Sequence, residues 1–304
     1  MSRTLRRAVV CALIFTTLPA GIAQAETADE FVARTNRELA ELGLELNAAG
    51  WTQATYINVD TQLINAKANE RFFAYVGKAV EDAKQFEGQP MSAASKRALV
   101  LLKFIATPAP DDPAKRAEFS KLLAAMEAKY GSGKYCPQGP ESCRDETKLK
   151  AVLESSRNYD ELLDAWTGWH STARPLRADY ARYVELANDG ARGFGFEDLG
   201  AMWRSNYDMS AAEFQREAAR LYGQVQPLYK ELHCYTRNKL QQKYGAEKVP
   251  SGKPIPAHLL GNMWAQQWDA IYELLEPYPG VSSLDVDSAL EKQSYDAVKM
   301  TKSA

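Results

Sequence analysis

Histidine is scarce in this 304-residue chain, which has only His170, His233 and His258. No two of them are spaced as the helical zinc-hydrolase motif H-E-x-x-H requires. A G-x-S-x-G nucleophile elbow and a Walker-type phosphate loop are also missing. The residues by themselves therefore identify no catalytic residue and no metal ligand.

The chain also lacks a strong excess of charge of one sign. Lys and Arg number 37 against 39 Asp and Glu, the formal net charge is -2, and the two signs are interspersed. Recognition of nucleic acid requires a basic patch or stripe that neutralises phosphates. We therefore expect no nucleic-acid partner.

Long apolar runs are confined to the start of the chain. Basic residues precede an apolar stretch shorter than the roughly 20 residues that a membrane-spanning helix needs, and Ala23-Gln24-Ala25 has the small-x-small pattern of a signal-peptidase site. We expect residues 1–25 to be a signal peptide, so that the mature protein is periplasmic or secreted and has no transmembrane segment. An uncleaved N-terminal anchor is the alternative.

Cysteine is nearly as scarce as histidine. Once Cys11 leaves with the signal peptide, Cys136, Cys143 and Cys234 remain. Turn-forming Pro and Gly residues lie between Cys136 and Cys143, which predicts a disulfide in an oxidising compartment. A metal site on the same two thiols is the alternative, but no further His or Cys is nearby. Cys234 lies in a helical pattern, where we expect a buried free thiol.

Sustained period-two alternation, the pattern of a half-buried strand, is absent. Apolar residues recur instead at spacings of three and four, and capping residues mark several helix starts. We expect helices over 27–42, 60–83, 92–105, 112–130, 159–169, 176–187 and 210–245, and a loop and helix within 284–304. The segment 92–105 is the most uniformly apolar, so we expect it deeper in the core. The predicted fold class is all-α, a large irregular helical assembly.

The segment from Pro254 to Trp268 is more specific than these patterns and reads PIPAHLLGNMWAQQW. It resembles the M2 peptidase family, the angiotensin-converting-enzyme-like peptidyl dipeptidases. Shorter matches support the resemblance: YDELL at 159–163, YVEL at 183–186, WRS at 203–205 and QPLY at 226–229. The Cys136 and Cys143 pair also falls where the family carries a short disulfide loop. The likeness covers nearly the whole mature chain.

The resemblance implies a cleft-containing, zincin-like helical domain that uses zinc and removes dipeptides from the free carboxylate end of oligopeptides. The family's zinc motif lies downstream of the matched segments, and residues 302–304 carry no helix stop signal. We expect residues 26–304 to be the N-terminal part of such a domain, truncated before the zinc ligands and inactive alone. The C-terminal part of the same domain would then be a partner.

Three side chains match family positions with assigned roles. Gln266 matches a glutamine that helps hold the substrate's terminal carboxylate, and Glu146 matches an acid beside the penultimate substrate side chain. Tyr207 matches a chloride ligand, so bound chloride is possible. Surface exposure or simple packing is the alternative role for each. His170 stands where many members have an arginine in another chloride site, and His258 is interpreted as structural.

A hypothesis from another class remains open. The same residues could form a non-catalytic helical module that binds peptides or protein partners through the remaining part of the cleft. Both hypotheses predict no peptidase activity of this chain. The truncated-peptidase hypothesis also predicts exposed apolar surface meant for the missing helices, and therefore poor solubility or pairing with the C-terminal part.

Overall fold

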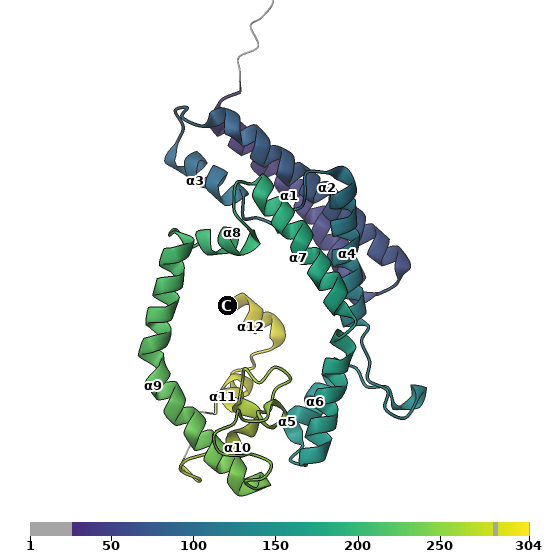
Figure 1. The fold of residues 1–304 in the computed structure, drawn as a ribbon, viewed down its shortest axis with the longest axis vertical. Coiled ribbons are helices and arrows are strands. Elements are labelled where there is room, and N and C mark those ends of the chain that lie inside the picture. The colour runs from purple at the N-terminus through teal and green to yellow at the C-terminus, as the bar shows by residue number, and fades with distance from the viewer. Residues whose placement is uncertain (1–25, 282–284, 304) are drawn as a thin grey trace, which may run out of the picture.

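The computed structural model describes residues 26–281 and 285–303 (Figure 1). The expected signal peptide, residues 1–25, lies outside the described residues. Within the described ranges the regular structure is helical, apart from one isolated antiparallel bridge, so the all-α prediction is confirmed. The α-helices are α1 (Ala28–Thr55), α2 (Val59–Ala83), α3 (Ala93–Leu102), α4 (Pro113–Gly131), α5 (Glu146–Ser155), α6 (Tyr159–Ala173), α7 (Leu176–Gly193), α8 (Leu199–Ser205), α9 (Ala211–Tyr244), α10 (Tyr272–Leu275), α11 (Val286–Lys292) and α12 (Ala297–Ser303). Short 3-10 turns are η1 (Lys84–Phe86), η2 (Pro140–Ser142), η3 (Ala257–Leu259) and η4 (Asp269–Ile271).

Capping residues fix where the long helices begin. Thr27 and Glu30 form a capping box at the start of α1, and Ser210 and Glu213 form another at the start of α9. In each box the side chains satisfy backbone N–H groups that have no partner within the helix. The two boxes predicted from the sequence are thus confirmed.

The first core joins α2, α4, α7 and α8. Phe73 and Phe119 pack with their ring centroids 5.5 Å apart, and Tyr183 of α7 stacks on Phe119 at 5.4 Å. Phe119 is fully buried. At one contact α7 approaches the backbone before α4 so closely that a Cβ on Gly190 would lie 2.3 Å from the Pro108 carbonyl oxygen. Only glycine permits that approach.

The second core joins α5, α6, the last turns of α9 and the loop from residue 249 to η4. Its fully buried side chains include Leu149 of α5, Leu240 of α9 and Met263 of the loop. Because α6 runs almost directly into α7, one pair of consecutive helices connects the two cores. In Figure 1, α6 and α7 lie across from α9.

The segment 92–105 is not placed as expected. Ser95 and Leu102 of α3 are buried, but Val100, Leu101 and Ile105 are exposed. One side of α3, with Ala98 and Leu99, packs against the cluster that contains Phe31 and Phe86, and its opposite side faces solvent. The prediction of a deep core helix is wrong.

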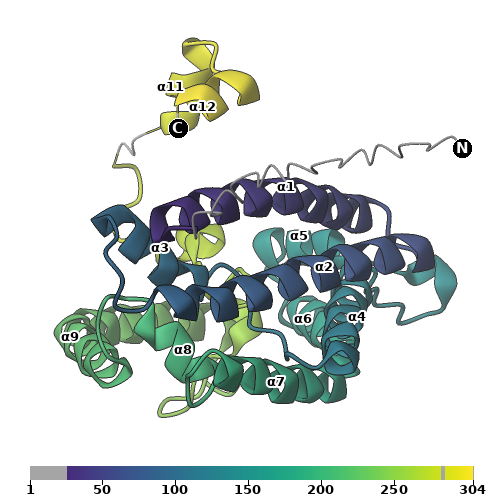
Figure 2. The ribbon, with the colours of Figure 1, turned by 90° about the horizontal axis from the view of Figure 1, so that it is seen from above.

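The α9 helix is largely uncovered over its first two thirds. Its buried residues are Thr236 and Leu240, near its end, and Cys234 is exposed, so the prediction of a buried thiol is wrong. Figure 2 shows α11 and α12 standing off from the remaining helices. None of the described helices combines the length and apolarity needed to cross a membrane.

Candidate functional site

Gln266 lies in a loop whose shape is set by buried neighbours. Met263 is fully buried, and its carbonyl accepts a hydrogen bond of 3.0 Å from the Trp166 indole of α6. The Asn262 side chain accepts from the Trp264 N–H at 2.8 Å, and Ala265 has a left-handed φ of 54°. Gln266 follows this turn with its side chain exposed. The loop therefore presents the amide on a rigid base, free to donate to an anion.

Glu146 is the first residue of α5 and is half-buried. Asp145 caps the same helix by accepting from the Lys148 N–H at 3.0 Å. One turn further on, Leu149 packs in the second core with Met263. Glu146 and Gln266 thus stand on the same packed unit, although no hydrogen bond within the described residues links them.

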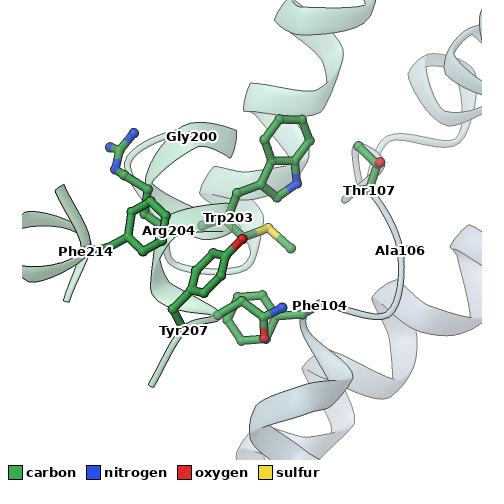
Figure 3. A pocket seen from close by; sticks show the side chains of 10 residues that line it. Phe104, Ala106, Thr107, Gly200, Trp203, Arg204, Tyr207 and Phe214 are labelled. Atoms are coloured by element: carbon green, nitrogen blue, oxygen red, sulfur yellow. The ribbon is translucent and has the colours of Figure 1, made fainter. Parts of the chain in front are cut away.

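Tyr207 lines a different pocket, of about 600 Å³, between α8, the start of α9 and the segment 104–107. Figure 3 shows Trp203 and Tyr207 on the α8 side of this pocket and Thr107 across from them. Tyr207 packs against Phe214 with tilted rings whose centroids are 4.3 Å apart. Arg204 also lines the pocket and has no ion pair within the described residues. A phenol and an unpaired guanidinium can both donate to an anion.

The expected carboxylate-holding and chloride-binding residues do not share one pocket. Tyr207 precedes the start of α9, whereas the loop of Gln266 contacts the second half of that helix. There Trp268 lies beside Tyr229 and His233, at 6.4 and 6.3 Å between ring centroids. Neither Gln266 nor Glu146 lines the pocket of Tyr207.

The histidines singled out in the sequence occupy packed positions. His258 is 5% exposed and packs against Tyr159 at 4.7 Å between ring centroids. Burial lowers the pKa of His258 to about 4, and its Nε2 has no hydrogen-bond partner. His170 stacks on Trp166 at 4.0 Å, and its Nδ1 lies 2.8 Å from the Trp166 carbonyl oxygen. Both positions are typical of structural histidines.

The predicted disulfide is present. Cys136 and Cys143 are bonded, with their Cα atoms 4.0 Å apart. Tyr135 and Arg144, which flank the two cysteines, pair through two backbone hydrogen bonds of 2.9 Å and so close the base of the loop. Asp164 then accepts from the Tyr135 hydroxyl and the Arg144 guanidinium, at 2.6 and 2.7 Å. The disulfide loop is thereby tied to α6.

The side chains that the structure describes do not fit a zinc site. Within the described residues no three His, Cys, Asp or Glu side chains are grouped so that they could hold a metal ion. His258 and His170 face aromatic rings instead of other ligands. These residues therefore supply no ligand set for a zinc-dependent step.

Two features of the surface were not found from the sequence. Arg204 belongs to the matched WRS segment, but nothing in that segment indicated that its charge would lie unpaired beside Tyr207. Glu127 of α4 lines another pocket, with residues of α1 and α2. The grouping around Glu127 could not be found from spacing along the chain, because its residues come from separate helices. Arg204 and Tyr207 are only three residues apart, but whether Arg204 has an ion-pair partner depends on how the helices pack.

Comparison with known proteins extends the resemblance. A family model described as "Angiotensin-converting enzyme", that of the M2 peptidases, matches residues 22–304. Angiotensin-converting enzyme of Oryctolagus cuniculus is 35% identical over 276 residues, 89% of this chain and 21% of the relative, and that of Sus scrofa is 35% identical over 279 residues, 90% of this chain and 21% of the relative. The angiotensin-converting enzyme-like protein Ace3 of Mus musculus is 39% identical over 188 residues, 62% of this chain and 25% of the relative.

The chain spans about a fifth of the length of the first two of these relatives. The family model covers nearly all of the chain, and the observed all-helical fold agrees with the resemblance first noted at Pro254 to Trp268. This chain therefore belongs to the M2 peptidase family, the family of angiotensin-converting enzyme.

Proposed function

We propose that this chain is the N-terminal portion of an exported zinc peptidyl dipeptidase domain, which removes dipeptides from the C-terminal ends of oligopeptides. Family membership supports the peptidase chemistry. The chain's own part would be to hold the substrate, with Gln266 donating to the terminal carboxylate and Glu146 beside the penultimate side chain. The zinc that activates water in such a peptidase would be held by residues outside these 304.

The exposed face of α9 is the observation that carries this proposal. Leu221, Val225, Leu228 and Leu232 follow one another at helical spacing, and each is exposed. A contiguous apolar stripe of this kind marks a surface that another part of a protein covers. We infer that the C-terminal portion of the same domain covers it in the active enzyme.

The proposal is tested by metal analysis and peptide hydrolysis on the purified chain. We expect no stoichiometric zinc and no dipeptide release from an N-blocked peptide, with or without added zinc, because no His, Cys, Asp or Glu cluster of the described residues suits the ion. Bound zinc together with dipeptide release would refute the proposal. Sequencing the reading frame downstream of Ala304 is the complementary test, and an in-frame H-E-x-x-H is expected.

The role of Gln266 has a matched control in its neighbour. Gln267 is exposed like Gln266 and lies in the same loop. We expect a peptide with a free C-terminal carboxylate to bind more tightly than its C-terminal amide, and Gln266→Ala to remove that difference. Gln267→Ala should leave it intact. Equal effects of the two substitutions in a binding titration would exclude the assigned role.

Chloride at Tyr207 is a separate part of the proposal. The phenol and the unpaired Arg204 guanidinium in one pocket support an anion there. Chloride should raise the thermal stability of the unaltered protein more than an equal concentration of a larger, weakly coordinating anion does. Tyr207→Phe should reduce that difference, and an unchanged difference would remove Tyr207 from the site.

A non-catalytic binding module is the second candidate function, and the same exposed α9 face favours it. Such a module would bind peptides or a protein partner without any complementary catalytic segment. A stop codon after Ala304, with no zinc motif in frame, would favour this candidate over the peptidase.

A further inference from the structure

A second pocket, of about 610 Å³, lies between α1, α2 and α4. Its volume is within the range of small-molecule sites. Trp51, Asn69, Glu127 and Tyr130 are among its lining residues, and the lining contains no Lys, Arg or His. Gln266, Glu146 and Tyr207 take no part in it. The pocket therefore has one carboxylate and no basic side chain.

A network of amides holds the carboxylate of Glu127. The Gln53 amide donates to the Ala124 carbonyl at 2.9 Å and to Glu127 Oε2 at 3.4 Å. The Asn65 amide donates to Gln53 Oε1 at 2.9 Å and to the same Glu127 oxygen at 3.1 Å. Asn69 donates to the carbonyl and side-chain oxygens of Asn65, both at 2.9 Å. Gln53 and Asn65 are each 2% exposed.

All amide N–H groups of this network already donate hydrogen bonds, whereas two of its oxygen atoms accept none from the described part of the chain. A side-chain amide has two N–H hydrogens, and those of Gln53, Asn65 and Asn69 are all engaged. Glu127 Oε1 and Asn69 Oδ1 accept no hydrogen bond from the described residues. A ligand group placed directly against the Glu127 carboxylate therefore meets unused oxygen acceptors, which favours a donor at that point and disfavours an anion.

The charge of Glu127 is also uncompensated. The carboxyl lies open at the pocket, yet enclosure by protein raises its pKa, and the hydrogen bond from Asn65 only partly opposes that rise. No Lys or Arg of the described residues forms an ion pair with it. A cationic donor would supply the missing positive charge.

Two aromatic side chains complete the pocket. Trp51 is 73% exposed, and Tyr130 is partly exposed while its ring packs edge-on against Trp169 at 5.3 Å. Aromatic faces attract cations and cover apolar groups. The exposed indole of Trp51 and the carboxylate of Glu127 line the same pocket. Together they suit a ligand that has a positively charged end and an apolar body.

We propose that this pocket binds a protonated primary amine with an apolar body, its ammonium group at Glu127 and its apolar part against Trp51 and Tyr130. A primary ammonium carries N–H donors for the two oxygen acceptors that the amide network leaves unused, Glu127 Oε1 and Asn69 Oδ1. This inference does not rest on the peptidase proposal.

The test compares benzylammonium with its neutral analogue benzyl alcohol by NMR titration of the purified protein. Benzylammonium should bind about tenfold more tightly or better, because hydrogen bonds to charged groups are the stronger ones. Glu127→Gln should bring the two affinities together. Glu41→Gln removes an exposed carboxylate of α1 outside the pocket and should leave the difference unchanged.

The ligand series on the unaltered protein carries the test even where Glu127→Gln fails to fold. Equal binding of benzylammonium and benzyl alcohol, or binding of a neutral sugar in place of the amine, would overturn the proposal. An undiminished preference in the folded Glu127→Gln protein would do so too. Benzyltrimethylammonium, which has the charge but no N–H donor, should bind more weakly than benzylammonium.

A free amine and the amino end of a peptide share this chemistry. Phe-Gly-Gly and its N-acetylated form tell the two sources apart. Binding of both benzylammonium and unacetylated Phe-Gly-Gly indicates a pocket that accepts peptide ends, whereas binding of benzylammonium alone indicates a pocket for free amines.

Discussion

The α2 and α9 helices are both long and amphipathic, but the apolar face of α2 is buried whereas that of α9 is exposed to solvent. In α2, Phe73, Val76 and Val80 are buried between α1, α4 and the neighbouring helices. In α9, Leu221, Val225 and Leu228 repeat with similar spacing, and all are exposed. An apolar stripe thus specifies a helix and a face, but the fold decides whether that face meets protein.

The largest expected effect is a loss of stability from a substitution on the buried face of α2. Phe73→Ala should lower the free energy of unfolding by about 3–5 kcal/mol, because it leaves a cavity beside Phe119. Leu228→Ala on α9 should change it by less than about 0.5 kcal/mol, because the side chain is 74% exposed. Denaturant unfolding of both variants measures the contrast. Similar losses would mean that α9 is covered in solution.

A pH titration examines the packed end of α9, where Tyr244 meets Tyr159 and Tyr159 meets His258. Burial lowers the pKa of His258 from its ordinary value of about 6.5 to about 4, so the unfolded chain takes up this proton at a higher pH than the folded protein does. Stability should therefore fall as the pH drops from about 6.5 towards 4, by up to about 2 kcal/mol between pH 7.5 and 5.

The control for that titration is a second histidine. His258→Phe should flatten the pH dependence over this range, whereas His233→Phe, which keeps His258, should retain it. Denaturant midpoints at pH 7.5 and 5 give the comparison. A steep dependence that survives His258→Phe would show that other groups control acid stability.

Substitutions on the exposed apolar face of α9 should change self-association and leave the free energy of unfolding nearly unchanged. Replacing Leu221, Val225, Leu228 and Leu232 together by Gln should reduce self-association of the isolated chain, because the exposed apolar stripe is removed. Light scattering against protein concentration measures it. Four Glu-to-Gln changes elsewhere on the surface should have no such effect, and unchanged association of the α9 variant would contradict the prediction.

The smallest expected effect concerns an exposed ion pair between α3 and the segment that precedes α9. Arg97 of α3 pairs with Asp208, which precedes α9, and both side chains are exposed. Arg97→Ala should cost less than about 1 kcal/mol, because solvent screens an exposed ion pair. Unfolding curves in low and high salt check this. A loss of several kcal/mol would show that this pair fixes α3 against the rest of the molecule.

Local patterns predicted most of the long helices and several of their starts, but they missed α5, α8 and α10 and ended α1 at residue 42 instead of Thr55. The capping boxes at Thr27 and Ser210 and the disulfide of Cys136 and Cys143 depend on residues close in the chain, and the structure confirms them. The depth of α3 and the burial of Cys234 were predicted wrongly. Both depend on which helices lie opposite, and a single segment does not contain that information.

The candidate sites also differ in whether they could be recognised from the sequence. The motif around Gln266 could be recognised from consecutive residues, although its role remains a proposal. The pocket of Glu127 could not, because Gln53, Asn65 and Glu127 come from three helices and acquire a shared hydrogen-bond network only on folding.

By itself the sequence determined the helical class, the starts of most long helices, the disulfide and the family resemblance. Spacing, capping and consecutive motifs act within a few turns of chain, so they can be read without the fold. The tertiary structure alone decided which apolar stripes are covered and which polar side chains meet. Burial and hydrogen bonding between distant residues depend on how the helices pack, and packing is a property of the whole chain.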